Sequence, residues 1–270
     1  MNIPAGTTQK IFVSRAFFAL ALGVYGLQQL YFGNFRGVQL PPWQFQFPGL
    51  RWLAYITGIL MIYAAVAIII DRQGKKAALV TGLVFLLFDA CFHLPYEFFA
   101  DSNKIYHLGI WDNSLKELAL AGGALTVAAS FTASATIRRC VPAVIGRICF
   151  CSTMIAFGIA HFLYLPFVAQ LVPRWMPDHE LWASIGGIAL ISSGLCILLD
   201  IQRRKIATLL GLMLLLWVFM VHLPHAVAQP VVDRGNELAS AFDALAFSGT
   251  SFLIALLSPH EAFMSQNDQE

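Results

Sequence analysis

The chain has 270 residues, of which 58% are hydrophobic and only 12% are charged, and its mean hydropathy is +0.70. Soluble domains carry about 25% charged residues, so this composition excludes a soluble globular protein and predicts the lipid bilayer as the main partner. The net charge of +2 comes without any block rich in Lys and Arg, which argues against nucleic acid as a partner.

Eight apolar stretches are each long enough for a membrane-crossing helix, which needs about 20 mostly apolar residues. Open strands would leave backbone groups unpaired in lipid, so the stretches are predicted to be helices. In chain order they lie at about 12–33, 52–70, 77–99, 114–134, 143–168, 181–199, 206–227 and 237–257. The first stretch follows the basic residues Lys10 and Arg15, as the apolar core of a signal peptide does. Its apolar run is longer than such a core usually is, so we predict a membrane span.

The basic residues predict how the helices are oriented. Of the 17 Lys and Arg residues, eleven lie on or near the side that holds both ends of the chain, and six lie on the other side. The positive-inside rule therefore predicts that both termini are cytoplasmic, in agreement with an even number of spans. We expect a multi-pass protein of a bacterial-type cell (inner) membrane.

The third and seventh stretches are near copies of one another. Residues 75–95 align with residues 204–224 at an offset of 129, and nine of 21 positions are identical. The identities include a glycine, a lysine near the start and a closing His-Leu-Pro, which stands in "FHLPY" and in "VHLPH". Shared leucines mean little between two membrane helices, but these three features at a fixed spacing indicate an internal repeat.

Neighbouring segments follow the same repeat with small gaps. Residues 25–32 resemble 157–164, and residues 118–124 resemble 245–251. The sequence therefore predicts two fused four-helix units, 1–138 and 139–270, the second with a short polar tail. Because each unit has an even number of spans, both point the same way, which is a parallel repeat about an axis along the membrane normal.

His-Leu-Pro is predicted to end or bend each helix near the outer face of the membrane. Leu94 and Leu223 precede a proline, which biases them away from helical backbone, and the proline removes a donor from the helix. The histidine of each motif can then bond to a carbonyl that has lost its partner, or reach a neighbouring helix. A ligand-binding or proton-transfer role for the histidines is the alternative.

The repeated unit resembles the DoxX and DoxX-like membrane protein family. The resemblance rests on four spans per unit, a Trp- and Pro-rich loop after the first, a third span ending in His-Leu-Pro and a fourth containing "KELALAGGAL". It implies an all-α integral membrane protein with eight transmembrane helices, arranged as two tandem, parallel-related four-helix bundles. Members of that family include membrane subunits of thiosulfate:quinone oxidoreductase, so the resemblance implies a quinone-linked redox subunit with a redox partner protein.

Ionisable side chains at membrane depth cost about 2.5–3.5 kcal/mol each on insertion scales, so each is a functional candidate. Asp89 and His93 are four residues apart and share a helix face. The carboxylate can fix the tautomer of the imidazole, or the pair can simply seal the bundle. With His222 and Asp243 of the second unit, they are the predicted proton-transfer residues.

Four further polar residues are predicted to line a pocket beside them: Gln29, Glu117, His161 and His225. His161 takes the place of Gln29 in the repeat, and Glu117 can alternatively stabilise a helix start. We expect one polar set near the outer end of each unit. Quinone suits an apolar, aromatic-rich cavity. The histidines could instead ligate haem, but no ligand motif favours this and no metal site is predicted.

The sequence does not establish that the protein is an enzyme. It contains no Gly-rich phosphate loop after a strand, no nucleophile elbow and no His-Glu-x-x-His. A non-catalytic membrane scaffold or assembly partner, and a small-solute carrier with a pathway between the halves, therefore stand as alternatives to a redox subunit.

Overall fold

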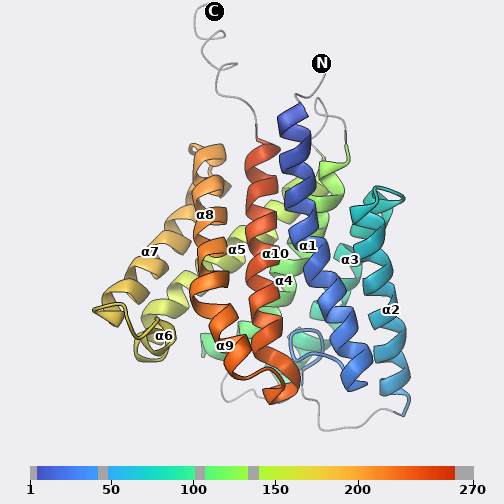
Figure 1. Cartoon of the computed structure of the whole chain (residues 1–270), viewed down its shortest axis with the longest axis horizontal. Coiled ribbons are helices and arrows are strands. Elements are labelled where there is room, and N and C mark those ends of the chain that lie inside the picture. Colours follow the sequence, from blue (N-terminus) through green and yellow to red (C-terminus); the bar gives the residue numbers. More distant parts are fainter. Residues whose placement is uncertain (1–4, 42–47, 101–106, 133–139, 259–270) are drawn as a thin grey trace, which may run out of the picture.

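The computed structural model describes residues 5–41, 48–100, 107–132 and 140–258, and the regular structure in these ranges is helical throughout (Figure 1). The long helices are α1 (Ala5–Phe32), α2 (Leu50–Ile69), α3 (Gly74–Phe88), α4 (Asp112–Ser130), α5 (Val141–Leu163), α7 (His179–Leu198), α8 (Arg203–Trp217) and α10 (Asn236–Leu256). The shorter helical segments are η1 (Asp89–His93), η2 (Tyr96–Ala100), η4 (Leu108–Trp111), α6 (Leu165–Leu171), η6 (Val218–His222), α9 (Leu223–Ala228) and η7 (Val232–Gly235).

Seven helical stretches within the described residues are long and apolar enough to cross a membrane. They are Gly6–Phe32, Leu50–Ile69, Gly74–Phe99, Val141–Leu163, His179–Leu198, Arg203–Ala228 and Val232–Leu256. The prediction of an all-helical, multi-pass membrane protein is therefore confirmed. The predicted span at 114–134 is not among the seven, although it coincides with helix α4, because α4 opens with charged residues and continues with many small ones.

Helices α4 and α10 form the core of the bundle. Every residue of α4 from Ala119 to Ser130 is buried, as is every residue of 246–251 in α10. Small side chains let helices approach closely in lipid, and Ser248 and Ser251 of α10 donate hydrogen bonds of 2.8 and 2.7 Å to backbone carbonyls of α8. A helix enclosed by protein needs no lipid-facing leucines, which explains the composition of α4.

The remaining long helices surround this core in a regular order. Helix α1 packs against α2 and α10, α5 packs against α7 and α4, α3 packs against α4, and α8 packs against α10. Helix α1 begins and α10 ends at the same end of the bundle, which we call the terminal end (Figure 1). At the opposite, distal end lie the end of α1 and the starts of α4 and α10 (Figure 1).

Two helix crossings are made by glycine pairs. In the α1–α2 crossing, a Cβ atom placed on Gly58 would lie 3.0 Å from the carbonyl oxygen of Gly26. In the α5–α7 crossing, a Cβ atom on Gly187 would lie 3.1 Å from the carbonyl oxygen of Gly158. In both crossings the backbones therefore touch, which only glycine allows in these positions.

Replacement of Gly26 by alanine tests the α1–α2 crossing. The new Cβ would meet the Gly58 carbonyl and lie 2.7 Å from Cγ1 of Ile62, so we expect the variant to be about 1–3 kcal/mol less stable, as for other overpacked sites. Gly23→Ala is the matched control, because its Cβ would make only an ordinary 3.7 Å contact with Ala65. Thermal unfolding in detergent compares the two, and equal melting temperatures would contradict the predicted clash.

Each His-Leu-Pro motif interrupts α-helical hydrogen bonding at the same place. Helix α3 ends at Phe88 and α8 at Trp217, and a five-residue π-helical turn, η1 or η6, follows each of them. The expected non-helical backbone before the prolines is wrong, since Leu94 has φ −56° and ψ −48° and Leu223 has φ −65° and ψ −43°. The wider π turn moves the proline ring away from the preceding turn, so the chain continues as a helix without the usual clash.

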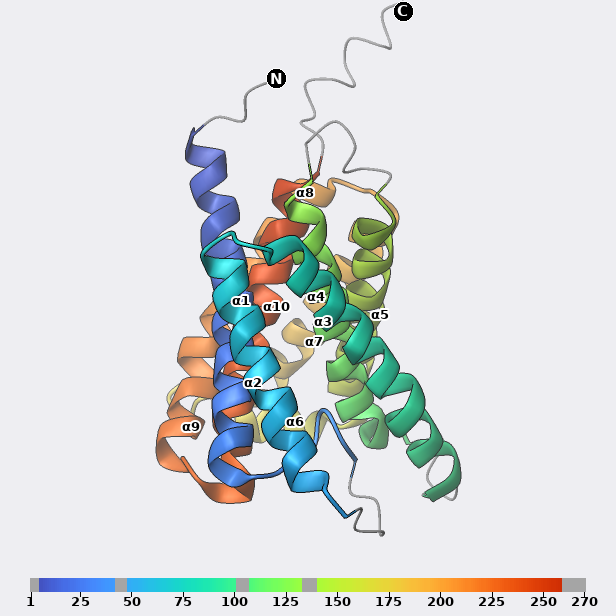
Figure 2. The same ribbon diagram turned by 90° about the vertical axis from the view of Figure 1, so that its right-hand side faces the viewer.

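Residues 33–41, which we call the re-entrant segment, fold back into the bundle from the distal end (Figure 2). Gly33, with φ +59°, turns the chain at the end of α1 in a conformation that glycine adopts without strain. Phe35, Val38 and Gln39 of the segment are then buried among the helices. This segment carries polar side chains into the interior.

Candidate functional site

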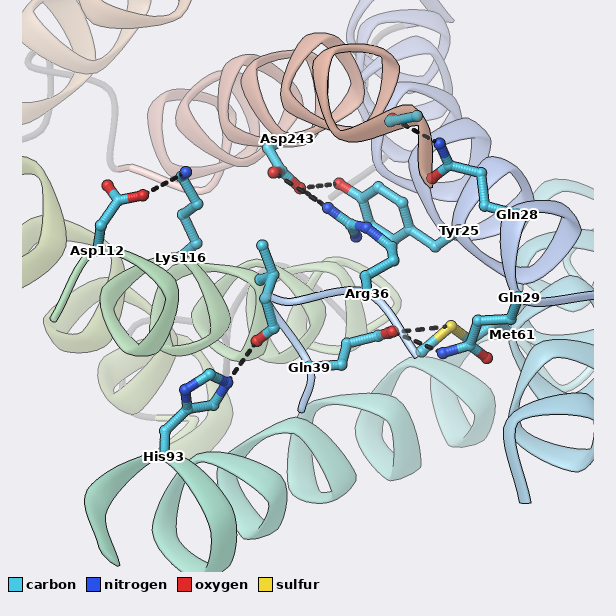
Figure 3. Close-up of polar contacts among 12 residues, drawn as sticks. Tyr25, Gln28, Gln29, Arg36, Gln39, Met61, His93, Asp112, Lys116 and Asp243 are labelled. Carbon is cyan, nitrogen blue, oxygen red and sulfur yellow. Dashed lines mark hydrogen bonds and ion pairs between the residues drawn. The ribbon is translucent and has the colours of Figure 1, made fainter. Parts of the chain in front are cut away.

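A buried ion pair joins the re-entrant segment to α10 (Figure 3). Nη2 of Arg36 donates to Oδ1 and Oδ2 of Asp243 at 3.0 and 3.2 Å. The hydroxyl of Tyr25, on α1, donates to Oδ1 of the same carboxylate at 2.5 Å, and the Arg36 guanidinium lies 3.7 Å from the centre of the Tyr25 ring. Tyr25 and Arg36 therefore share the carboxylate of Asp243, which is 218 and 207 residues away from them along the chain.

The positive charge of Arg36 is balanced by the groups that contact it. Burial disfavours the charged guanidinium, but the carboxylate of Asp243 and then the hydroxyl of Tyr25 outweigh this and raise the pKa of Arg36 above its ordinary value. Arg36 is therefore a permanent buried cation. Its counter-charge must stay in place, because an unpaired buried charge is strongly destabilising.

Glu117, on the second turn of α4, is a second buried carboxyl group. It is 0% exposed, and among the described residues neither of its side-chain oxygens has a hydrogen-bond partner. Arg36, Asp89 and Asp243 are close enough to act on its charge. Buried polar atoms nearly always have partners, so this carboxyl group marks a candidate site.

A chain of polar contacts runs from α1 to α2 through the re-entrant segment (Figure 3). Nε2 of Gln29 donates to Oε1 of Gln39 at 2.6 Å, and Nε2 of Gln39 lies 3.3 Å from the sulfur of Met61. The hydroxyl of Thr57 donates to Oε1 of Gln29 at 3.0 Å. Sulfur is a weak acceptor, so the amide of Gln39 is held in place but can still donate to a better partner.

The structure gives Asp89 and His93 different partners. The hydroxyl of Ser114 donates to Oδ1 of Asp89 at 2.6 Å, whereas Nε2 of His93 lies 2.7 Å from the carbonyl oxygen of Val38 in the re-entrant segment. The expected contact of the carboxylate with the imidazole is therefore absent from the described residues. His93 instead reaches a neighbouring segment, as one interpretation of His-Leu-Pro predicted.

Only some of the predicted site residues in the second unit lie near one another. His222 lies within electrostatic range of Asp243, Lys116 and His225. The contacts of His161 are elsewhere: Nδ1 lies 2.7 Å from the carbonyl oxygen of Phe157, and the ring stacks on Trp217 with centroids 6.0 Å apart. Asp243 thus belongs to a site shared with α1 and the re-entrant segment, rather than to a separate site in the second unit.

Two cavities lie beside these buried polar side chains. The distal cavity has a volume of about 260 Å³ and a mostly polar lining that includes Gln28, Arg36, Asn113, Lys116 and Arg234. The second, which we call the lipid-facing pocket, has a volume of about 270 Å³ and a mostly apolar lining from α2, α3 and the re-entrant segment, with Glu117 in its wall. Of the eight predicted site residues, only Glu117 lines either of these two cavities.

The lipid-facing pocket opens between α2 and α3. These helices meet at their terminal-end connection and diverge toward the distal end (Figure 2). Leu60 and Tyr63 of α2 and Val80 and Val84 of α3 line the pocket and are also exposed on the apolar outer surface. The opening of the pocket therefore faces the bilayer, and Glu117, although fully buried itself, lies in its wall.

Sequence reasoning missed Tyr25, Arg36 and Gln39. The sequence identifies Arg36 only as a basic residue outside the predicted spans, and Tyr25 only as part of the repeated segment 25–32. The sequence "GNFRG" at 33–37 contains two glycines and an asparagine, which are typical of a tight turn. Only the tertiary structure shows that the chain re-enters the bundle there.

Within the described part of the chain, no three His, Cys, Asp or Glu side chains are grouped closely enough to hold a metal ion. Comparison with known proteins finds no family model, no curated protein and no solved structure that matches this chain.

Proposed function

We propose that this protein is a DoxX-like membrane subunit that binds a quinone in the lipid-facing pocket and takes part in quinone-linked redox chemistry with a partner protein. The observation that carries the proposal is an apolar pocket that opens on the bilayer, with a buried carboxyl group in its wall that has no hydrogen-bond partner in the described part of the chain. Quinones are lipid-soluble, and their polar oxygens lie on an otherwise apolar ring. Ligand sites of this kind are mostly apolar with a few placed polar groups.

The pocket offers both kinds of contact that a quinone needs. Phe35, Phe85 and Phe88 supply aromatic surface for the ring. Glu117 can accept a hydrogen bond from a quinol hydroxyl, and the amide of Gln39 can donate to a quinone carbonyl. The isoprenoid tail would leave between α2 and α3 into lipid.

In this proposal Glu117, Asp89 and the histidines around the pocket accept the protons of a quinol, while Asp243 stays ionised as the partner of Arg36. Asp89 and Asp243 both act electrostatically on Glu117, His222 lies near Asp243, and His93 holds the re-entrant segment from the other side. Quinone turnover at the wild-type rate by both His93→Ala and His222→Ala would remove the roles of the two histidines.

The proposal includes a tandem origin, with units 1–138 and 139–270 and eight spans in which α4 is the fourth. The helix contacts support it, since α1 packs on α2 as α5 packs on α7, and α3 packs on α4 as α8 packs on α10. The glycine crossings support it as well, because Gly158 and Gly187 stand where the repeat places Gly26 and Gly58. The excess of basic residues at the terminal end supports cytoplasmic termini in an inner membrane.

Photolabelling with a lipid-soluble azidoquinone in proteoliposomes tests the proposal. We expect label on the peptides of α2 and α3 that line the pocket, and competition by unlabelled quinone. Glu117→Leu should weaken binding of the reduced quinol about 10- to 100-fold, since a hydrogen bond to a charged group contributes about 1.5–3 kcal/mol.

Glu180→Leu, which removes an exposed acid from the first turn of α7, is the control and should bind like the wild type. Label spread evenly over all lipid-facing helices, without competition, would contradict the proposal. In that case the scaffold and carrier functions would be the ones to test.

A further inference from the structure

A thin partition separates the two cavities. Lys116 lines the distal cavity, and the next residue, Glu117, lines the lipid-facing pocket. In the re-entrant segment, Phe35 lines both cavities, Arg36 lines the distal one and Gln39 the lipid-facing one. The side chain of Phe35 therefore borders both cavities, and the buried charged residues Arg36 and Glu117 border one cavity each.

We infer that Glu117 is a proton-exchanging carboxyl group, reached by lipid-soluble molecules between α2 and α3, which trades its proton with water at the distal end through the distal cavity. The inference rests on the proposed function for its natural ligand, a quinol whose hydroxyl would transfer a proton to the Glu117 carboxylate. Its test uses no quinone, so the two can fail separately.

The surroundings of Glu117 support the uptake of a proton. A buried carboxylate without a donor is costly, and protonation removes its charge. The titratable groups near it are Arg36 on the re-entrant segment, Asp89 on η1 and Asp243 on α10, with Tyr63 and Lys76 in the walls of the pocket. Asp243 already occupies Nη2 of Arg36, while Nε and Nη1 have no hydrogen-bond partner within the described ranges. The guanidinium can therefore also stabilise the deprotonated form of Glu117.

The arrangement favours exchange with the distal end. From Glu117 toward that end lie the charged groups of Arg36 and Lys116 and a polar cavity. Toward the terminal end the pocket continues between apolar residues such as Val80, Val84 and Phe85 before it reaches Lys76. Protons move along polar groups and water, so the path from Glu117 to the distal end is the more favourable one.

Labelling with dicyclohexylcarbodiimide, a lipid-soluble reagent for protonated carboxyl groups, tests this inference on the full chain in oriented proteoliposomes. Mass spectrometry should find the adduct on Glu117 and none in Glu117→Gln. Because only the protonated acid reacts, the labelling rate should fall as the distal-side pH rises, by about tenfold per unit once the acid is mostly ionised. The terminal-side pH should have no effect.

Asn113→Trp is the variant that tests the path. Asn113 lines the distal cavity and takes no part in the ion pair, so a bulky ring there should suppress the response to distal pH while Glu117 is still labelled. Absence of label on Glu117 in the folded protein, or a rate that follows the terminal-side pH, would overturn the inference. Distal-dependent labelling without quinone binding would uphold it and overturn only the proposed function.

Discussion

Replacement of Asp243 with leucine is expected to lower the free energy of unfolding by about 3–5 kcal/mol, the usual cost of leaving a buried charge without its partner. Arg36 would keep its charge but lose both contacts of 3.0 and 3.2 Å, and Tyr25 would lose the acceptor of its hydroxyl. Unfolding in mixed micelles, followed by circular dichroism, measures the change.

Three further variants separate the charge from other effects. Asp233→Asn, at an exposed acid of the same end of the bundle whose left-handed backbone (φ +44°) asparagine also tolerates, should change stability by less than about 0.5 kcal/mol. Tyr25→Phe removes one hydrogen bond and should cost about 1–3 kcal/mol. Arg36→Met combined with Asp243→Leu should recover much of the loss, because both charges are then removed. A single Asp243→Leu variant as stable as Asp233→Asn would show that Arg36 does not depend on this carboxylate.

The ion pair also joins the two predicted units. Arg36 belongs to the first predicted unit and Asp243 to the second, and the Tyr25 hydroxyl adds α1 to the same contact. The hydroxyl of Tyr25 has no equivalent in the second predicted unit, because Phe157 stands at the corresponding position of the repeat. The buried polar layer is thus a single asymmetric site built on a duplicated sequence pattern.

Much of the helical framework was predictable because it depends on local sequence. Apolar runs of about 20 residues must form helices in lipid, and proline must disturb the hydrogen bonding before it. The alignment of 75–95 with 204–224 predicted that both helices are disturbed at matching positions, and the two π-helical turns lie at such positions. Glu117 was found because a charged residue inside a span is costly and therefore conspicuous.

The composition of the polar site was less predictable because it depends on tertiary packing. Arg36 lies between two spans, where a basic residue ordinarily stays in water, and only the burial of residues 33–41 brings it to Asp243. The pairing of Asp89 with Ser114 instead of His93 likewise depends on how α4 approaches η1. Spacing along one helix identified groups on a shared face but not their partners.

Replacement of Val84 with tryptophan is expected to weaken quinone binding at least about tenfold, a loss of about 1.4 kcal/mol or more. Val84 lines the lipid-facing pocket and is also exposed at its opening, so the indole would occupy the space through which a lipid-soluble molecule enters. The fold should tolerate it, because the valine is not part of the buried core. Titration of an azidoquinone in proteoliposomes measures the effect.

Leu83→Trp is the matched control for the entry route. It introduces the same ring at the adjacent position of α3, where the leucine is exposed to lipid and does not line the pocket. If ligands reach Glu117 from the bilayer between α2 and α3, Val84→Trp should reduce both quinone binding and carbodiimide labelling, and Leu83→Trp should reduce neither. Equal effects of the two substitutions would mean that the ligand arrives by another path, and the pocket between α2 and α3 would lose its role.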